Sequence, residues 1–536
     1  MIKYTSQAQL NLEFDMPFGG ELEPSNRWVI MSSLVDWDAF AREYYKNFRS
    51  KEGRTPIDAR VVLGAVIIKH YYCLSDIETI EMIKENPYLQ YFIGYKQFSR
   101  TAAFDPSLFV SIRKRMGEEI FEALTNSIMQ RAASKDKVKR KTGSTSSKQE
   151  PSVPSDLSTL SKSSNNESCS ATNIKEDTSA SESEKKSTNN GKLQIDATVA
   201  DANIKYPTDL GLLNDARLKS EELTDFLCGL NPKLKRPRTY RRVARKAYLN
   251  VAKKKKKSKK ELRSAIRLQL NYLERNIRSI NKLLDDFDHI PFDRVRYKYF
   301  FVIGELARQQ RQMYDTKTHS IEHRIVSIHQ PHVRPIVRGK AKNNTEFGNK
   351  VNVCLDNGIA YVHRFSWEAY NEGEDLPSAV EDYKRRWGYY PDLLQVDKIY
   401  LTKKNRQYLK ERGIRHSGDP LGRKPKREKT SRYQKEKHRR EAAERNQIEG
   451  KFGLGKVRYA LDRIRAKLTS TSLSWINAIF LVMNLATTLA KFRCALFFES
   501  ICRIIEQMLN IKKIVRHLNQ LFYARRFAKL TIGRAS

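Results

Sequence analysis

Three acidic residues stand where their carboxylates could hold a divalent metal ion. Asp196 falls on a predicted strand, Asp397 ends a predicted buried strand, and Glu449 lies on a late predicted helix. The carboxyl ends of parallel strands are where α/β sheets present ligand sites, and a helix acid beside them could complete an oxygen cage. Mg²⁺ prefers oxygen ligands, so three carboxylates with waters and a phosphate oxygen would suit it. Each acid alone is more often a solvated or capping residue, and spacing does not bring the three together.

The helix that carries Glu449 also places two cations beside it. Arg445 and Glu449 are four residues apart, and Glu449 and Lys456 are seven apart, so all three share one helix face. Cations on both sides of a metal-binding acid suit a phosphate backbone. An ordinary salt-bridge stripe is the alternative. Three glycines in this segment indicate close backbone packing or an early helix end: Gly450, Gly453 and Gly455.

Strand patterns indicate the sheet that would position these acids. Apolar residues alternate from Leu193 to Val199, which predicts a half-buried strand with Asp196 on the same face as Gln194 and Thr198. Asn357-Gly358 between two alternating runs predicts a hairpin. Residues 393–397 read as a short buried parallel strand, with helices predicted at about 376–387 and 403–412. Strands alternating with helices indicate an α/β domain over residues 192–490.

Residues 1–132 read as an all-helical domain. Capping-box patterns begin at Thr55, where Pro56 would take the first helical position, and at Ser75. A further helix after Asp105-Pro106 carries three adjacent cations: Arg113, Lys114 and Arg115. A helix-turn-helix-like DNA reader and a small helical bundle with a solvated basic face fit these residues equally well.

The rest of the chain separates by composition. Residues 133–191 are rich in Ser, Thr, Asn, Lys and Glu, which predicts a disordered linker. Residues 215–325 read as a basic helical insertion, with 15 Lys or Arg and no acid between residues 233 and 260. Solubilising charge is the alternative reading of the Lys253–Lys257 run. Residues 491–536 read as a basic helical tail.

The overall composition points to a polyanionic partner. The 536 residues contain 100 Lys plus Arg against 61 Asp plus Glu, a formal net charge of +39. Six cysteines without a CxxC pair argue against a disulfide scaffold or a cysteine zinc site. No secretory signal is visible at the N-terminus, which predicts a cytoplasmic protein. The uncharged segment Thr469–Ala490 contains Asn477 and Asn484, so a buried core helix is favoured over a membrane span.

Histidines offer only a weak second metal site. Four lie close in sequence, without a supporting acid or cysteine pattern: His319, His323, His329 and His332.

Several blocks of the sequence together resemble bacterial insertion-sequence transposases of the DDE class. These are Leu193–Thr198 followed by Ala202–Asp209, then Val396–Tyr400, then Arg445–Lys456 with Arg458-Tyr459 beyond. Residues from Gly53 to about Arg115 resemble the N-terminal domain common in that group. Ala442 stands where the family often has Tyr, and Ala197 stands where Gly often follows the first Asp.

The resemblance implies an RNase H-like catalytic core, with a DNA-binding N-terminal domain and the basic helical insertion. It implies that Asp196, Asp397 and Glu449 bind two Mg²⁺ ions, with Mn²⁺ as a substitute, and that Arg445 and Lys456 contact DNA. The expected activity is cleavage of element ends and strand transfer into target DNA by a homo-oligomer associated with the nucleoid. A decayed, inactive DNA-binding protein and a nuclease that cuts without joining are the alternatives.

Overall fold

The structure is a computed structural model that describes residues 16, 20–48, 55–142, 189–337, 345–418 and 432–532. The predicted linker falls mostly on residues 143–188, which lie outside the described residues. The helices and strands, in chain order, are α1 (Arg27–Leu34), α2 (Trp37–Tyr45), α3 (Ala59–Tyr72), α4 (Asp76–Glu85), α5 (Pro87–Phe92), α6 (Leu108–Arg115), α7 (Glu118–Thr142), β1 (Lys192–Asp201), α8 (Asp209–Leu230), α9 (Arg241–Ala252), α10 (Lys259–Leu284), α11 (Arg294–Thr316), β2 (Arg334–Val337), β3 (Thr345–Asp356), β4 (Ile359–Ser366), α12 (Leu376–Trp387), β5 (Leu393–Val396), α13 (Lys403–Glu411), β6 (Arg415–His416), α14 (Arg432–Tyr459) and α15 (Thr469–Ile532).

One mixed sheet lies at the centre of the α/β part. Its strands are ordered β2-β3-β1-β5-β6, and β4 also pairs with β3. The pairs β1–β3 and β3–β4 are antiparallel, whereas β1–β5 and β5–β6 are parallel. β1 therefore stands where an antiparallel half of the sheet meets a parallel half. The predicted α/β class is confirmed.

The predicted hairpin is present. β3 and β4 are joined through Asn357 and Gly358, both with positive φ, as a two-residue hairpin turn with that sequence requires. The short strand β5 pairs in parallel with β1, as predicted. The prediction of a half-buried β1 was wrong: residues 193–195 and 197–200 are all buried.

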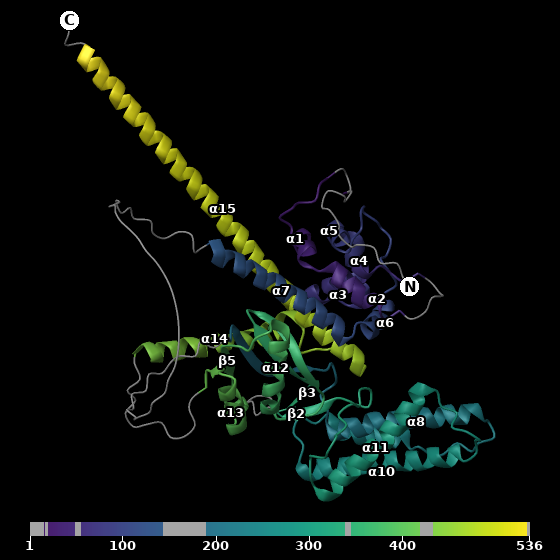
Figure 1. Cartoon of the computed structure of the whole chain (residues 1–536). Coiled ribbons are helices and arrows are strands. Elements are labelled where there is room, and N and C mark those ends of the chain that lie inside the picture. The colour runs from purple at the N-terminus through teal and green to yellow at the C-terminus, as the bar shows by residue number, and fades with distance from the viewer. Residues whose placement is uncertain are drawn as a thin grey trace, which may run out of the picture.

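Helices cover both faces of the sheet, which explains the burial of β1. Gln194 bonds to the backbone of α14, so α14 lies over the face that carries Gln194 and Asp196. On the other face, Asn352, which pairs with Ala197, donates to Asp375 at the start of α12. Figure 1 shows α12 and α14 next to the strands of the sheet.

The N-terminal helices share one hydrophobic core with the sheet and with α15. Buried residues of this core run from Trp28 to Leu489, and Trp475 of α15 packs edge-on against His70 of α3. The uncharged segment from Thr469 is thus a buried helix: 72 % of its most apolar window is buried. By length and composition alone, this is one helix of the described chain that could cross a membrane.

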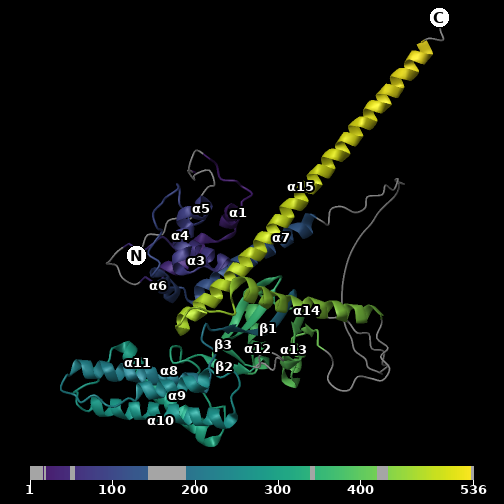
Figure 2. The same ribbon diagram turned by 180° about the vertical axis from the view of Figure 1, so that it is seen from behind.

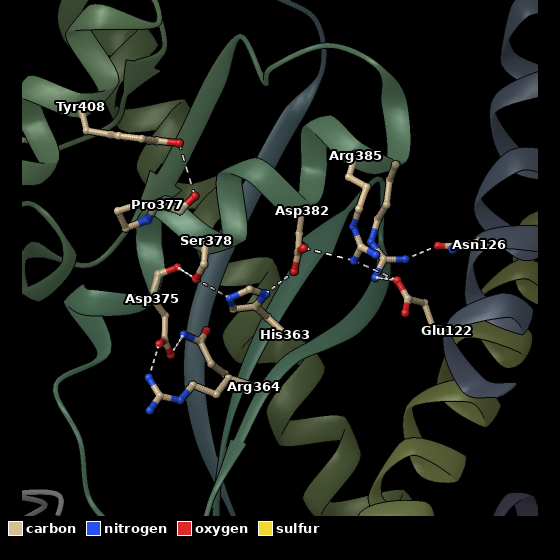
Figure 3. Close-up of polar contacts among 12 residues, drawn as sticks. Glu122, Asn126, His363, Arg364, Asp375, Pro377, Ser378, Asp382, Arg385 and Tyr408 are labelled. Carbon is tan, nitrogen blue, oxygen red and sulfur yellow. Dashed lines mark hydrogen bonds and ion pairs between the residues drawn. The ribbon is translucent and has the colours of Figure 1, made fainter. Parts of the chain in front are cut away.

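Polar side chains connect α7 with α12, the helix that packs on the sheet (Figure 3). Arg386 of α12 donates to Glu122 of α7 at 2.9 Å and also bonds to Asn126. His363 of β4 bonds to two residues of α12, to Asp382 at 2.6 Å and to Ser378 at 2.8 Å. These contacts fix β4, α12 and α7 as one unit.

The basic helical insertion forms its own lobe. Helices α8–α11 pack around a separate cluster that includes Leu213, Leu270, Leu273 and Leu306. Buried Arg217 is satisfied within the lobe by Glu221, Asn214 and Gln269. Figures 1 and 2 both show this lobe set beside the sheet.

Several element boundaries differ from prediction. Asp58, not Thr55, caps α3, whereas the predicted capping box at Ser75 is present at α4. α7 continues to Thr142, beyond the predicted helical boundary of residue 132. The uncharged helix and the basic tail form one continuous helix, α15, of 64 residues.

Candidate active site

Asp196 lies on β1, and Asp397 directly follows the adjacent parallel strand β5. The β1–β5 pairing aligns Gln194 with Gln395 and Ile195 with Val396, so the next position on each chain is one of the two acids. Residues in register on parallel strands point to the same face of a sheet. Both carboxylates therefore project from the α14 face, at the carboxyl end of β5. The strand prediction for both acids is thereby supported by backbone pairing.

Two buried glutamines fix α14 over this pair. Gln194 donates to the side chain of Gln395 at 2.8 Å and to the Glu444 carbonyl at 2.9 Å. Gln395 donates to the Glu441 carbonyl at 2.8 Å. Because both glutamines are buried, these bonds replace water for groups that cannot reach it. They set the height of α14 above the strands, and hence the position of Glu449.

Arg445 connects the second acid with the third. Its guanidinium lies 2.5 Å from Asp397 Oδ1 and 3.2 Å from Glu449 Oε1. Asp397 and Glu449 are about half-exposed, with side chains 52 % and 55 % accessible, while Arg445 is 24 % accessible. Asp196 is half-buried and accepts a bond from the Ala197 amide. Asp397 and Glu449 thus meet at Arg445, and Asp196 lies on the neighbouring strand.

The donor set fits a hard divalent cation by chemistry. Carboxylate oxygens are the ligands that Mg²⁺ prefers, and two of them come from neighbouring strands. As the side chains stand, Arg445 provides the positive charge between Asp397 and Glu449. No group of three or more His, Cys, Asp or Glu in the described residues is close enough to hold an ion. The triad as a metal site therefore stays a prediction.

Lys456, further along α14, meets a second acidic group. Its ammonium lies 3.4 Å from Glu346, and both side chains are largely covered. Asp201, at the end of β1, is near this pair, and burial together with the negative charge of Glu346 raises the pKa of Asp201 to about 6. Lys456 balances two carboxylates here, so it has a structural partner as well as its predicted DNA contact.

The glycines of α14 include one that is required by packing. A Cβ at Gly455 would lie 3.1 Å from Leu461 and 3.3 Å from Met483, whereas Gly450 and Gly453 have no neighbour within 4 Å. The predicted close backbone packing is therefore found at one of the three glycines, Gly455. The helix does not end early, since α14 runs to Tyr459.

The three cations of α6 have different surroundings. Arg113 forms two bonds to Asp76, at 3.0 and 3.1 Å, and lies over the Trp475 ring of α15. Arg115 is exposed but lies over the Phe48 ring, and Lys114 is exposed. Arg113 is thus committed to the helical core. The predicted DNA contact, which no observation tests, is better suited to Lys114 and Arg115.

The role of the two glutamines was not predicted, although the sequence carries a signal for it. Both strands contain the same order of Leu, Gln, an apolar residue and Asp: Leu193–Asp196 and Leu394–Asp397. A polar residue repeated at one position of two buried strands indicates a shared hydrogen-bonding role. The Tyr400 hydroxyl was also missed; burial raises its pKa, with the charges of Glu372 and Asp196 adding to the effect.

Comparison with known proteins gives matches over two parts of the chain. Residues 394–486 match the family model described as "Transposase DDE domain", and residues 18–115 match the one described as "Transposase domain (DUF772)". The first includes Asp397, Arg445, Glu449 and Lys456; the second includes Arg113, Lys114 and Arg115. These two parts of the chain are therefore similar to transposase domains.

A curated relative has no assigned function. The chain is 32 % identical over 111 residues to an uncharacterized protein, ORF8 in the nfe locus of Rhizobium meliloti; the match covers 21 % of this chain. The chain spans about half, 53 %, of that relative's length. No solved structure matches. Together these findings confirm the predicted resemblance to insertion-sequence transposases of the DDE class.

Proposed function

We propose that this protein is a DNA transposase that binds the ends of an insertion sequence, cleaves them and transfers the strands to target DNA. The observation that carries the proposal is that Asp196 and Asp397 each follow the last β1–β5 pair, Ile195 with Val396, and that Arg445 of α14 bonds to both Asp397 and Glu449. The two regions that match transposase models, one before β1 in the sequence and one after it, support the proposal. The core is proposed to be RNase H-like, supported by an antiparallel β4-β3-β1 half continuing into parallel β5 and β6.

In this proposal Asp196, Asp397 and Glu449 hold two Mg²⁺ ions, or Mn²⁺ in their place. Bound there, the metal would supply an activated water and stabilise the leaving oxygen of the phosphodiester. The buried glutamines keep the three carboxylates at a fixed spacing. When DNA binds, Arg445 releases a carboxylate and binds a DNA phosphate in its place. Its planar guanidinium can bind the phosphate with two parallel hydrogen bonds.

The proposed partner is DNA at the element ends and at the target. The net charge of +39 favours a polyanion, and phosphate contacts would come from Lys456, Lys114 and Arg115 besides Arg445. Arg113 would act indirectly, by holding α6 against Asp76 and α15. The proposed setting is the cytoplasm, in association with the nucleoid, as a homo-oligomer.

The test is a strand assay on a labelled DNA fragment that carries the element end with its flanking DNA. With Mg²⁺ the purified chain should nick at the element boundary and then join the freed 3′ end to a target plasmid, and EDTA should stop both steps. Nicks without joined product would favour a nuclease that only cuts. Binding of the end with neither product would favour an inactive DNA-binding protein, and no binding would contradict the proposal.

A further inference from the structure

The distal part of α15 leaves the body of the protein with an apolar surface uncovered. Both views show α15 running past α7 and away from all other elements (Figures 1 and 2). Phe497 is 64 % exposed, Ile504 56 % and Met508 60 %. An exposed row of large apolar side chains on one helix is costly in water, so it marks an interaction surface.

These residues follow the spacing of a coiled-coil seam. Phe497, Ile501, Ile504 and Met508 are separated by steps of four, three and four residues. The sequence of the same helix continues these steps with Ile511, Val515, Leu518 and Phe522. Eight apolar residues at alternating steps of three and four make almost four heptads without a polar interruption. Such a seam pairs with another helix of the same repeat.

We propose that residues 497–522 of α15 form a coiled coil with the same segment of a second copy of this chain. A membrane is a poor occupant, because charged residues are spread through this stretch: Glu499, Arg503, Glu506, Lys512, Lys513 and Arg516. The chain's own segment 143–188 is a poor one too, since it offers only isolated apolar residues. A second copy of the chain carries the same heptads, so its seam matches this one.

Charge favours an antiparallel pair. Residues 497–510 carry Glu499, Glu506 and Arg503, so 1 − 2 gives −1; residues 511–522 carry Lys512, Lys513 and Arg516, giving +3. Parallel helices would place the two +3 halves together, whereas antiparallel helices place each +3 half beside a −1 half.

The seam positions are consistent with that direction. Met508 would lie opposite Ile511 of the second copy, and Ile504, Ile501 and Phe497 would lie opposite Val515, Leu518 and Phe522, respectively. Every seam residue then meets another seam residue, with the twofold axis between residues 509 and 510. The proposal is independent of the catalytic assignment, because it uses no residue of the site.

The first experiment measures the mass of the full-length chain by sedimentation over a range of concentrations. Ile504→Lys with Met508→Lys places four lysines in the seam of a pair and should raise the dimer Kd by at least about 100-fold. The matched control is Leu496→Lys with Leu509→Lys, which changes two exposed apolar residues of the same helix off the seam. The control should keep the wild-type Kd. A monomeric wild type, or equal weakening by both variants, would overturn the proposal.

The second experiment reads the direction. In a background with Cys494→Ser and Cys502→Ser, Ile501→Cys and Leu518→Cys chains are mixed and oxidised, and linked peptides are identified by mass. An antiparallel pair should give the mixed 501–518 disulfide, because two 501 positions would be about 25 Å apart along the axis. Predominant 501–501 links would overturn the antiparallel arrangement. Wild-type chain that stays monomeric yet floats with phosphatidylglycerol vesicles would instead make the surface a lipid contact.

Discussion

At the scale of single residues, Arg445 links two of the three candidate acids. It forms ion pairs with both Asp397 and Glu449. In the protein alone, its positive charge therefore neutralises the carboxylates that a divalent cation would neutralise. If the proposed function holds, a metal ion and Arg445 would compete for the same carboxylates until a DNA phosphate bound the guanidinium. This competition would couple the arrival of DNA to the assembly of the metal site.

Replacement of Arg445 by alanine should therefore strengthen metal binding while weakening activity. Loss of one nearby positive charge, about 1 kcal/mol at a water-exposed site, should lower the Kd for Mn²⁺ about fivefold in the absence of DNA. Free Mn²⁺ measured by paramagnetic resonance checks this. The control is Arg440→Ala, whose cation pairs with Glu436 on the exposed start of α14 and should leave the Kd unchanged. Weaker Mn²⁺ binding by Arg445→Ala would contradict the competition.

Asp356 gives a pH-dependent prediction at the same scale. It is 2 % exposed at the end of β3, and burial raises its pKa to about 6 from a usual value of 3.8. Between these values the folded chain holds a proton that the unfolded chain has released, so stability is lost as pH rises through the window. Above about pH 6 the ionised Asp356 lowers the free energy of unfolding by the full amount.

Asp356→Asn removes this cost. The variant should be more stable by about 3 kcal/mol at pH 7.5, and the gain should shrink to under about 1 kcal/mol at pH 4. Urea unfolding at both pH values measures it, with the exposed Asp288→Asn as a control that should show no such trend. A gain that is constant with pH would refute the assigned cause.

At the scale of elements, the site depends on how α14 is seated on β1 and β5. Gln194 and Gln395 bond to backbone carbonyls of α14, so the helix is held by its main chain and not only by apolar contact. Since Glu449 is one to two turns beyond Glu441 and Glu444, a tilt of α14 would move it away from the strand acids.

Gln395→Met should therefore reduce strand cleavage without reducing DNA affinity. Methionine keeps the volume of glutamine but removes the bonds to Gln194 and α14, at a cost of about 1–2 kcal/mol in stability. The cleavage rate should fall by about tenfold or more, with end binding unchanged in a gel-shift titration. Gln407→Met, at an exposed position of α13, is the matched control. An unchanged cleavage rate would mean that the glutamines serve stability alone.

Elements were predictable where local signals decide the structure. The Asn357-Gly358 turn, the capping box at Ser75 and the short buried strand at Leu393 each depend on a few neighbouring residues. The burial of β1 on both faces depends on helices far along the chain, so alternation within Leu193–Val199 could not reveal it.

Within the candidate site, the sequence identified the acids but not their surroundings. Asp397 could be picked out because it ends an apolar run, whereas its contact with Arg445 needs the seating of α14. Arg113 looked like a surface cation from its neighbours in sequence. Its partners Asp76 and Trp475 lie 37 and 362 positions away, so only the tertiary structure could assign it to the core.

At the scale of the whole molecule, the two cores divide the protein into a body that contains the candidate site and a basic lobe. The body joins the N-terminal helices, sheet and α15 in one core, and α8–α11 have another. On α9, Arg242, Arg245 and Lys246 are exposed. The lobe could therefore contact DNA at a distance from the acids, which would extend the bound length of the element end.

Neutralising that face should change the salt dependence of binding. With Arg242, Arg245 and Lys246 all replaced by Gln, the slope of log K against log salt should fall in magnitude by up to about 2.7. Fluorescence anisotropy on an end fragment between about 50 and 200 mM salt measures the slope. Lys403, Lys404 and Lys410 on α13, replaced by Gln together, remove the same charge elsewhere. Equal changes in both variants would mean that the lobe has no special contact.

The central claim is that Asp196, Asp397 and Glu449 act together as the catalytic acids. The most direct measurement is the rate of nicking at the element end by Asp196→Asn, Asp397→Asn and Glu449→Gln, beside Glu444→Gln from the same helix. Each of the three should lose at least about 1,000-fold in rate while binding the end with wild-type affinity, and Glu444→Gln should remain active. Near-wild-type nicking by any one of the three would contradict the account.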